Sequence, residues 1–86
     1  MEILKVSTKT KPNLVAGVLA QYLNRDKEVE VHTVGAGALN QAIKAIASLK
    51  SMISLVDKKI AVFPSFMEVT IEEKIKTAIK LEIKLL

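Results

Sequence analysis

VHTVGAGALNQAIKAIASLK, residues Val31–Lys50, is the stretch that decides the fold. An apolar run with β-branched residues ends at Gly35-Ala36-Gly37, and a helical apolar pattern without glycine or proline begins directly after it. This order predicts a strand, a very tight turn and the start of a helix. Backbone N–H groups at a helix start carry a partial positive charge, so the turn is a candidate anion site. The stretch lacks the third glycine of the dinucleotide fingerprint and the Gly-Lys-Ser/Thr of a P-loop, so it identifies no nucleotide pocket.

The residues around this stretch predict the other elements of the N-terminal half. Ile3–Ser7 has the period-two pattern of a strand. The polar loop that follows ends at Pro12, a residue suited to the first turn of a helix, and apolar residues then recur at helical spacing. The predicted elements after the first strand are a helix over Pro12–Asn24, a strand over Glu28–Val34 and a second helix over Ala38–Met52.

The C-terminal half predicts two further strands. Lys59–Phe63 is apolar on both faces, which favours a central place in a sheet. Pro64 cannot donate a ladder hydrogen bond and marks an edge, a bulge or a strand end, and we expect Glu68–Glu72 to continue the same arm. Thr77–Leu85 alternates most regularly and should form a hairpin with the preceding strand.

The element order β-α-β-α-β-β predicts one two-layer α/β domain over residues 1–86. Short connections favour right-handed crossovers, which place both helices on one face of a four-stranded mixed sheet. We expect the other face of the sheet to be exposed to solvent. It would carry Lys5, Glu30, His32, Lys80, Glu82 and Lys84.

Composition narrows the class of protein. Half of the 86 residues are hydrophobic but only 3% are aromatic, so the core must be aliphatic. The chain has no cysteine and one histidine, which excludes disulfides and Cys-ligated zinc and leaves no metal site or cofactor to predict. Neither a signal-peptide pattern nor a membrane-length apolar run is present, so a soluble cytoplasmic protein is expected.

The charge pattern indicates what kind of polyanion the chain would bind. Its formal net charge is +4, and Arg25 is the only arginine among its basic residues. Reading of base edges depends on bidentate arginine, whereas lysine holds phosphate as a point charge. If the protein binds nucleic acid, we therefore expect it to bind the backbone rather than a sequence.

The predicted topology brings several polar groups to one edge of the sheet. Loops that follow two parallel strands lie at the same edge, where open α/β sheets place ligand sites. If the third strand is parallel to the second, the hairpin tip projects from that edge as well. The residues concerned are Lys9 and Lys11 after the first strand, Gly35, Ala36, Gly37, Asn40 and Gln41 after the second, and Lys74 and Lys76 near the tip.

Simpler explanations exist for each of these groups. The glycines can serve only a tight turn and close packing, and a single surface lysine is usually a solvated charge. Asn40 and Gln41 can satisfy local backbone groups, contact a second protomer or bind a ligand, and the sequence leaves these three options open. Phe66 with Met67 indicates core or dimer contact rather than a base-stacking platform.

No catalytic constellation is present. His32 has no second histidine beside it and faces the wet side of the predicted sheet. Glu72 and Glu73 are adjacent, so a strand would turn them to opposite faces, and a solvated turn is the better interpretation. We therefore expect that the protein is not an enzyme.

Two motifs resemble a known family. GAGALNQAIKAIA together with EILKVSTKTKPNLVAGVLA, and more weakly FPSFMEVTIEEKIKTAIKL, resembles the stage V sporulation protein S family of bacteria. That family is similar in fold to the Alba chromatin proteins, which bind nucleic acid. The resemblance implies a regulator of septation and sporulation that forms homodimers or larger assemblies and binds DNA or RNA through the first loop, the region of the second helix and the hairpin.

The match to Alba proteins is partial at the expected contacts. Lys11 before Pro12 matches the Alba lysine before its proline, whereas Thr10 stands where those proteins have a second lysine. The arginine of the Alba glycine motif becomes Ala36 or Gly37, and a lysine early in the second helix aligns nearest Gln41.

Two hypotheses of function follow. In the first, a dimeric regulator binds nucleic acid nonspecifically, with lysines against phosphates. In the second, a regulatory scaffold binds a partner protein or a small anionic ligand at the glycine turn, over Gly35–Gln41. The lysines of the first hypothesis are Lys9, Lys11, Lys44, Lys74 and Lys76.

Overall fold

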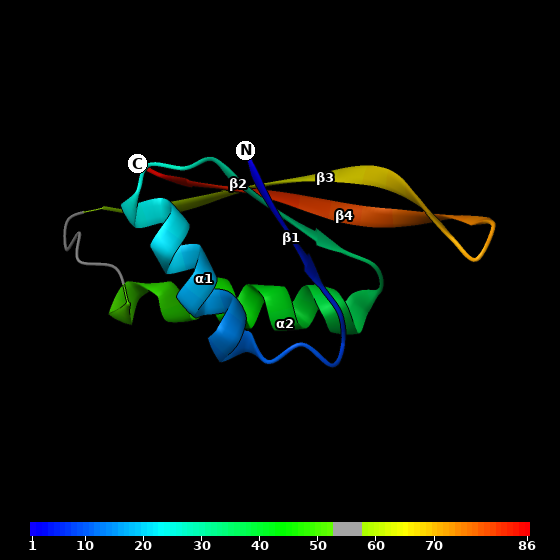
Figure 1. Cartoon of the computed structure of the whole chain (residues 1–86), viewed down its shortest axis with the longest axis horizontal. Helices are drawn as coiled ribbons and strands as arrows, with labels where there is room; N and C mark the ends of the chain where they lie inside the picture. Colours follow the sequence, from blue (N-terminus) through cyan, green and yellow to red (C-terminus); the bar gives the residue numbers. More distant parts are fainter. Residues whose placement is uncertain (53–57) are drawn as a thin grey trace.

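Two helices cover one face of a four-stranded sheet in the computed structural model, which describes residues 1–52 and 58–86 (Figure 1). The order is the predicted β-α-β-α-β-β. In the described part of the chain, no helix is long and apolar enough to cross a membrane. The elements are β1 (Glu2–Val6), α1 (Pro12–Asn24), β2 (Val29–Thr33), α2 (Ala36–Ala47), the 3₁₀ helix η1 (Ser48–Ser51), β3 (Ile60–Ile71) and β4 (Lys74–Leu85).

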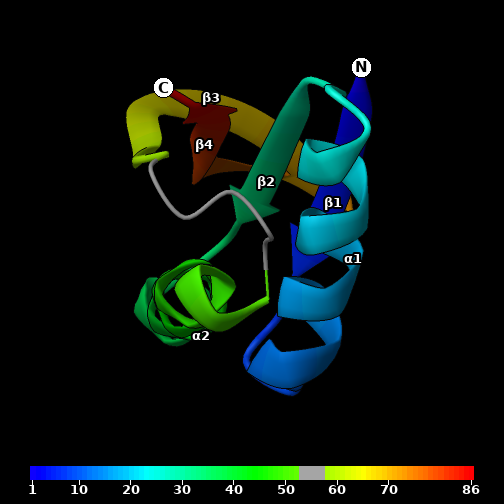
Figure 2. The ribbon, with the colours of Figure 1, turned by 90° about the vertical axis from the view of Figure 1, so that its left-hand side faces the viewer.

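The sheet is mixed, with the strand order β1-β2-β4-β3. β1 and β2 are parallel, and β4 is antiparallel to both of its neighbours. β3 therefore runs parallel to β2, which confirms the condition for placing the hairpin tip at the same end as the loops after β1 and β2. Figure 2 shows α2 below the sheet and α1 beside β1 at the right of the view.

The prediction that the third strand is central is wrong. β3 is an edge strand, and β4 lies between β2 and β3. β3 runs without interruption through Pro64, which is opposite Leu81 of β4. A proline is tolerated in an edge strand because only one side of the strand has to donate hydrogen bonds. Glu68 continues the same strand, as expected, whereas Glu72 lies beyond its end.

The core is aliphatic, as the composition requires. Its largest fully buried apolar side chains are Leu19 of α1, Leu49 of η1, and Ile83 and Val31 of the sheet. Alanines occupy the buried faces of both helices, and small side chains let the helices approach the sheet and each other closely. The buried alanines are Ala16 and Ala20 of α1 and Ala38, Ala42 and Ala45 of α2.

The second helix begins and ends earlier than predicted. α2 starts at Ala36, inside the glycine motif, and ends at Ala47, where the chain tightens into η1. Its first hydrogen bond joins the Leu39 N–H to the Gly35 carbonyl at 3.1 Å. Only Gly35 belongs to the turn, and Gly37 lies within the first turn of the helix.

The β3–β4 hairpin is longer than the sheet that carries it. Its strands pair from Ile60 opposite Leu85 to Ile71 opposite Lys74, but only residues 79–83 of β4 also pair with β2. The pairs over residues 67–78, at the turn end of the hairpin, project from the sheet as a two-stranded arm, visible at the right of Figure 1. The arm contributes to a longest molecular extent of 43 Å.

The arm ends in a strained turn. Glu72 and Glu73 have φ values of +50° and +66°, a backbone conformation that suits Asn-Gly far better than two glutamates. Both side chains are exposed, which confirms the prediction of a solvated turn.

The helix-free face, which is the side of the sheet away from α1 and α2, is less exposed to solvent than predicted. The side chains of His32 and Glu30 are only 14% and 13% exposed, and His32 Nε2 lies 3.0 Å from Glu30 Oε1. The register places His32 between Lys5 of β1 and Lys80 of β4. The expected surface histidine is therefore a half-buried partner of a carboxylate.

Candidate nucleic-acid interface

The loop between β1 and α1 presents two lysines on a hydrogen-bonded frame. The Ser7 N–H donates to Thr10 Oγ1 at 2.9 Å, the Thr10 N–H donates to the Ser7 carbonyl at 3.1 Å, and the Lys9 N–H donates to Ser7 Oγ at 3.2 Å. Lys9 is exposed within this frame, and Lys11 is exposed at the N-cap of α1. The loop therefore orders its own backbone while it leaves both cationic side chains free to move.

The glycine turn after β2 is packed against this loop. Gly35 has φ +90° and ψ 158°, a combination that is close to exclusive to glycine. A Cβ on Gly37 would lie 2.6 Å from Cγ2 of Thr8, so the first turn of α2 approaches the loop more closely than a larger residue allows. The side-chain amide of Gln41 donates to the Thr10 carbonyl at 3.1 Å.

These contacts give each glycine and Gln41 a part in the fold. Gln41 satisfies a backbone carbonyl, as in the first of the three options, although that carbonyl belongs to the loop and not to its own helix. Asn40 is exposed, as are Ala36 and the two glycines. The motif thus joins the lysine-bearing loop to the start of α2.

Replacement of Gly35 by alanine should lower the free energy of unfolding by about 1–3 kcal/mol, because a Cβ is strained at this backbone conformation. The space around the new Cβ is empty, so the loss would be conformational and not steric. Gly17, in α1, is the matched control, since its Cβ would also meet nothing within 4 Å. Gly17→Ala should stabilise by up to about 1 kcal/mol through helix propensity. Urea denaturation of both variants measures the contrast, and equal effects would show that the turn is not strained.

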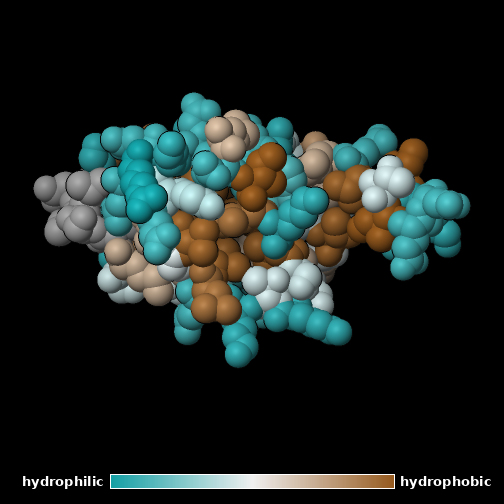
Figure 3. Space-filling model, viewed as in Figure 1, coloured by the Kyte–Doolittle hydropathy of each residue, from teal (hydrophilic) through white to brown (hydrophobic). Residues whose placement is uncertain are grey.

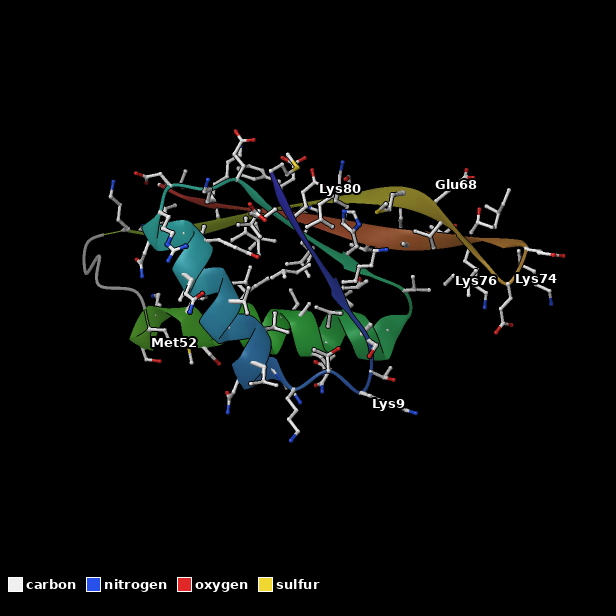
Figure 4. All side chains as sticks on the ribbon, in the orientation of Figure 1. Lys9, Met52, Glu68, Lys74, Lys76 and Lys80 are labelled. Atoms are coloured by element: carbon white, nitrogen blue, oxygen red, sulfur yellow. The ribbon has the colours of Figure 1, made fainter. Side chains whose placement is uncertain are left out.

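The four lysines predicted at one edge of the sheet lie in the loop after β1 and on the arm. Figure 4 shows Lys9 below the end of β1 and Lys74 and Lys76 on the projecting arm. Lys11 follows in the same loop as Lys9, and all four are exposed. Lys44 is exposed in the last turn of α2, roughly 12 Å along the helix from Ala36 at 1.5 Å per residue. This lysine of the first hypothesis therefore lies away from the start of α2.

The arm is cationic on one face only. In the β3–β4 register Lys74 lies opposite Ile71 and Lys76 opposite Val69, whereas Glu68 lies opposite Thr77 on the other face. Figure 4 shows Glu68 directed away from Lys74 and Lys76. Glu72 and Glu73 lie at the tip. The lysines of the arm therefore lie on one face, and its glutamates lie on the other face and at the tip.

Two further cations lie on the helix-free face of the sheet. Lys5 and Lys80 flank His32 on the helix-free face, in a row that crosses β1, β2 and β4. Sequence reasoning placed both on a wet surface without giving them a role, because their proximity depends on the register between strands that are distant in sequence. Within residues 1–52 and 58–86, no three His, Cys, Asp or Glu side chains lie close enough to hold a metal ion.

Comparison with known families identifies a match to nearly the whole chain. Residues 2–85 match the family described as stage V sporulation protein S (SpoVS). The match spans the loop, the glycine turn and the arm.

Comparison with solved structures supports the fold. Alba from Thermoplasma volcanium aligns with a TM-score of 0.64, covers 96% of each chain and is 14% identical in sequence. At that identity the likeness shows the fold alone. The chain therefore has an Alba-like fold, as the sequence predicted.

Proposed function

Because the chain belongs to the stage V sporulation protein S family, we propose that it is a non-enzymatic regulator that binds DNA or RNA nonspecifically as a homodimer. Membership implies a role related to sporulation. The proposed nucleic-acid binding rests on the exposed lysines of the loop after β1 and of the arm. They come from two separate segments, the loop after β1 and the arm.

The geometry of this surface suits a phosphate backbone. Lys9 approaches from the body of the protein, and Lys74 and Lys76 approach from the arm (Figure 4). Lys11 is exposed in the same loop as Lys9, at the N-cap of α1. Lysines on flexible stems, held apart on separate elements, can contact successive phosphates and release their counterions. Lys44 would extend the contact along α2 when the nucleic acid is long enough.

The same surface contains no arginine. Arg25 is the C-cap of α1, at the opposite end of that helix from Lys11. No arginine therefore lies beside the loop and arm lysines to read guanine by a bidentate contact, which supports binding without sequence preference.

The proposed homodimer rests on apolar side chains that the fold leaves uncovered. Phe66 is 80% exposed and Ile75 is 71% exposed, so neither is a core residue of one protomer. Ile75 is on the arm and Phe66 is just before its base, and both lie on the face of the hairpin opposite to Lys74 and Lys76. Of the two options for Phe66, core or dimer contact, dimer contact is the one that fits.

The scaffold hypothesis has less support. Gly35, Gly37 and Gln41 are each explained by the turn and its contacts with the loop. We therefore rest the proposal on the lysines and not on the glycine turn.

Charge reversal in the loop tests the surface. Lys9→Glu with Lys11→Glu should lower affinity for nucleic acid by tenfold or more at about 0.1 M salt, because phosphate contacts become repulsions. Fluorescence anisotropy with labelled duplex DNA, single-stranded DNA and RNA measures the loss. Lys58→Glu with Lys59→Glu is the matched control, since it changes net charge equally at exposed positions at or before the start of β3. Equal losses in the two double variants would mean that the loop has no specific part in binding.

A further inference from the structure

A hollow lies between the end of β1 and the arm, on the helix-free side of the sheet. Its volume is about 390 Å³. One wall is formed by Lys5–Thr8 with His32 and Val34, and the other by Val69–Ile71 of β3. The arm twists as it leaves the sheet (Figure 1). The face of the arm that carries Val69 and Ile71 therefore turns toward the loop after β1.

The lining combines apolar surface with a few polar groups. Val34, Val69 and Ile71 supply apolar side chains, and Ser7 and Thr8 place hydroxyl groups nearby. Figure 3 shows brown, apolar surface over the base of the arm, between the body of the protein and the teal tip. A concave, largely apolar site of this size with convergent polar groups is typical of small organic ligands or of one unit of a polymer.

The hollow is bordered by positive charge. Lys5 is part of its lining and is exposed. Paired residues of an antiparallel ladder project to the same face, so Lys76 accompanies Val69 and Lys74 accompanies Ile71. The apolar wall therefore has two lysines beside it on the neighbouring strand. The ligand should have a flat or apolar part and an anionic part.

One polar group in the lining is held in place. His32 is fixed by its 3.0 Å contact with Glu30, and its side chain is only 14% exposed. Imidazole rings serve as stacking partners for unpaired bases in nucleic-acid sites. A positioned ring, hydroxyl groups and lysines form the set of groups that recognises a nucleotide.

We propose that this hollow binds one nucleotide unit, with its base between His32 and the Val69–Ile71 wall and its phosphate against Lys5, Lys74 or Lys76. The inference deepens the proposed function and rests on it when the nucleotide belongs to a single strand. A base stacked inside a duplex cannot enter the hollow, so the site favours unpaired nucleotides. A free mononucleotide has the same chemistry, and the experiment distinguishes the two sources.

The test compares two single strands of equal charge and adds a duplex. Anisotropy at constant salt is measured with an oligothymidylate, with an abasic strand of the same length and with a duplex of the same length. The wild type should bind oligothymidylate about tenfold more tightly than the abasic strand, which carries the same phosphates but no bases. Val69→Trp, which fills the hollow, should abolish that difference and keep the affinity for the abasic strand.

Two further variants keep the test interpretable. Ile71→Trp fills the hollow from the same wall, at a more exposed position. It replaces Val69→Trp if that variant does not fold. Thr77→Trp places the same side chain on the other face of the arm and should leave the difference intact. Thermal shift with thymidine monophosphate, for the wild type and Val69→Trp, tests the free nucleotide.

Each outcome decides a different claim. Equal binding of oligothymidylate and the abasic strand by the wild type would overturn the hollow while leaving nonspecific phosphate binding in place. A monophosphate shift that Val69→Trp abolishes, without binding of any strand, would support the hollow and overturn the proposed function. No binding of any strand or of the monophosphate would overturn both.

Discussion

Charge reversal of both arm lysines, Lys74→Glu with Lys76→Glu, is expected to weaken binding of nucleic acid about a hundredfold at 0.1 M salt. Each lysine–phosphate contact contributes a log–log salt slope of about −0.9, so one contact is worth roughly tenfold between 1 M and 0.1 M salt. Two lost contacts should therefore make the salt slope less negative by about 2. Both side chains are exposed on one face of the arm, so the substitutions should leave the core intact.

Lys58→Glu with Lys59→Glu is again the control of equal charge change. It should weaken binding by less than tenfold, because only the long-range field changes. The combination of the arm and loop reversals should remove measurable binding. An arm variant that binds as tightly as the wild type, with an unchanged slope, would show that the arm does not contact phosphate.

Phe66→Asp should convert the proposed homodimer into monomers. Burial of a phenylalanine side chain contributes about 1.5–3 kcal/mol, and a two-fold interface contains the residue twice. The dimer dissociation constant should therefore rise at least a hundredfold, before the cost of a buried carboxylate is counted. Sedimentation velocity over a concentration series measures the change. The fold should survive, since Phe66 is 80% exposed in one protomer.

Leu14→Asp provides the comparison for this interface. Leu14 is 68% exposed in the first turn of α1, where an acidic residue is compatible with the helix dipole. Its replacement should leave the dimer unchanged. A wild-type protein that sediments as a monomer at every concentration would rule out the dimer, and dissociation caused only by Leu14→Asp would place the interface on α1.

Local patterns predicted most of the fold. The span of α1 was predicted as observed because Pro12 and the apolar spacing define both of its ends. The order of strands within the sheet was harder, because the apolar run before Pro64 resembles a buried strand. Its place at the edge depends on β4 pairing with two neighbours, a long-range property that no local pattern contains.

In the candidate interface, too, some features could be predicted from the sequence and others depend on long-range structure. Lys9, Lys11, Lys74 and Lys76 were assigned to one end of the sheet from topology alone, and the parallel relation of β3 to β2 supports that placement. The hollow could not be predicted, because it needs the twist of the arm and the register of Lys5 with His32. Lys44 was proposed as a phosphate contact but was not assigned to this edge, and it lies in the last turn of α2.

The most direct test of nucleic-acid binding is anisotropy of the wild type with duplex DNA, single-stranded DNA and RNA across a salt series. Contacts from four to six lysines predict micromolar binding with a log–log slope of about −4 to −5 on duplex. The nucleic acid bound most tightly would then identify the class of partner. Absence of binding to all three at low salt would contradict the account.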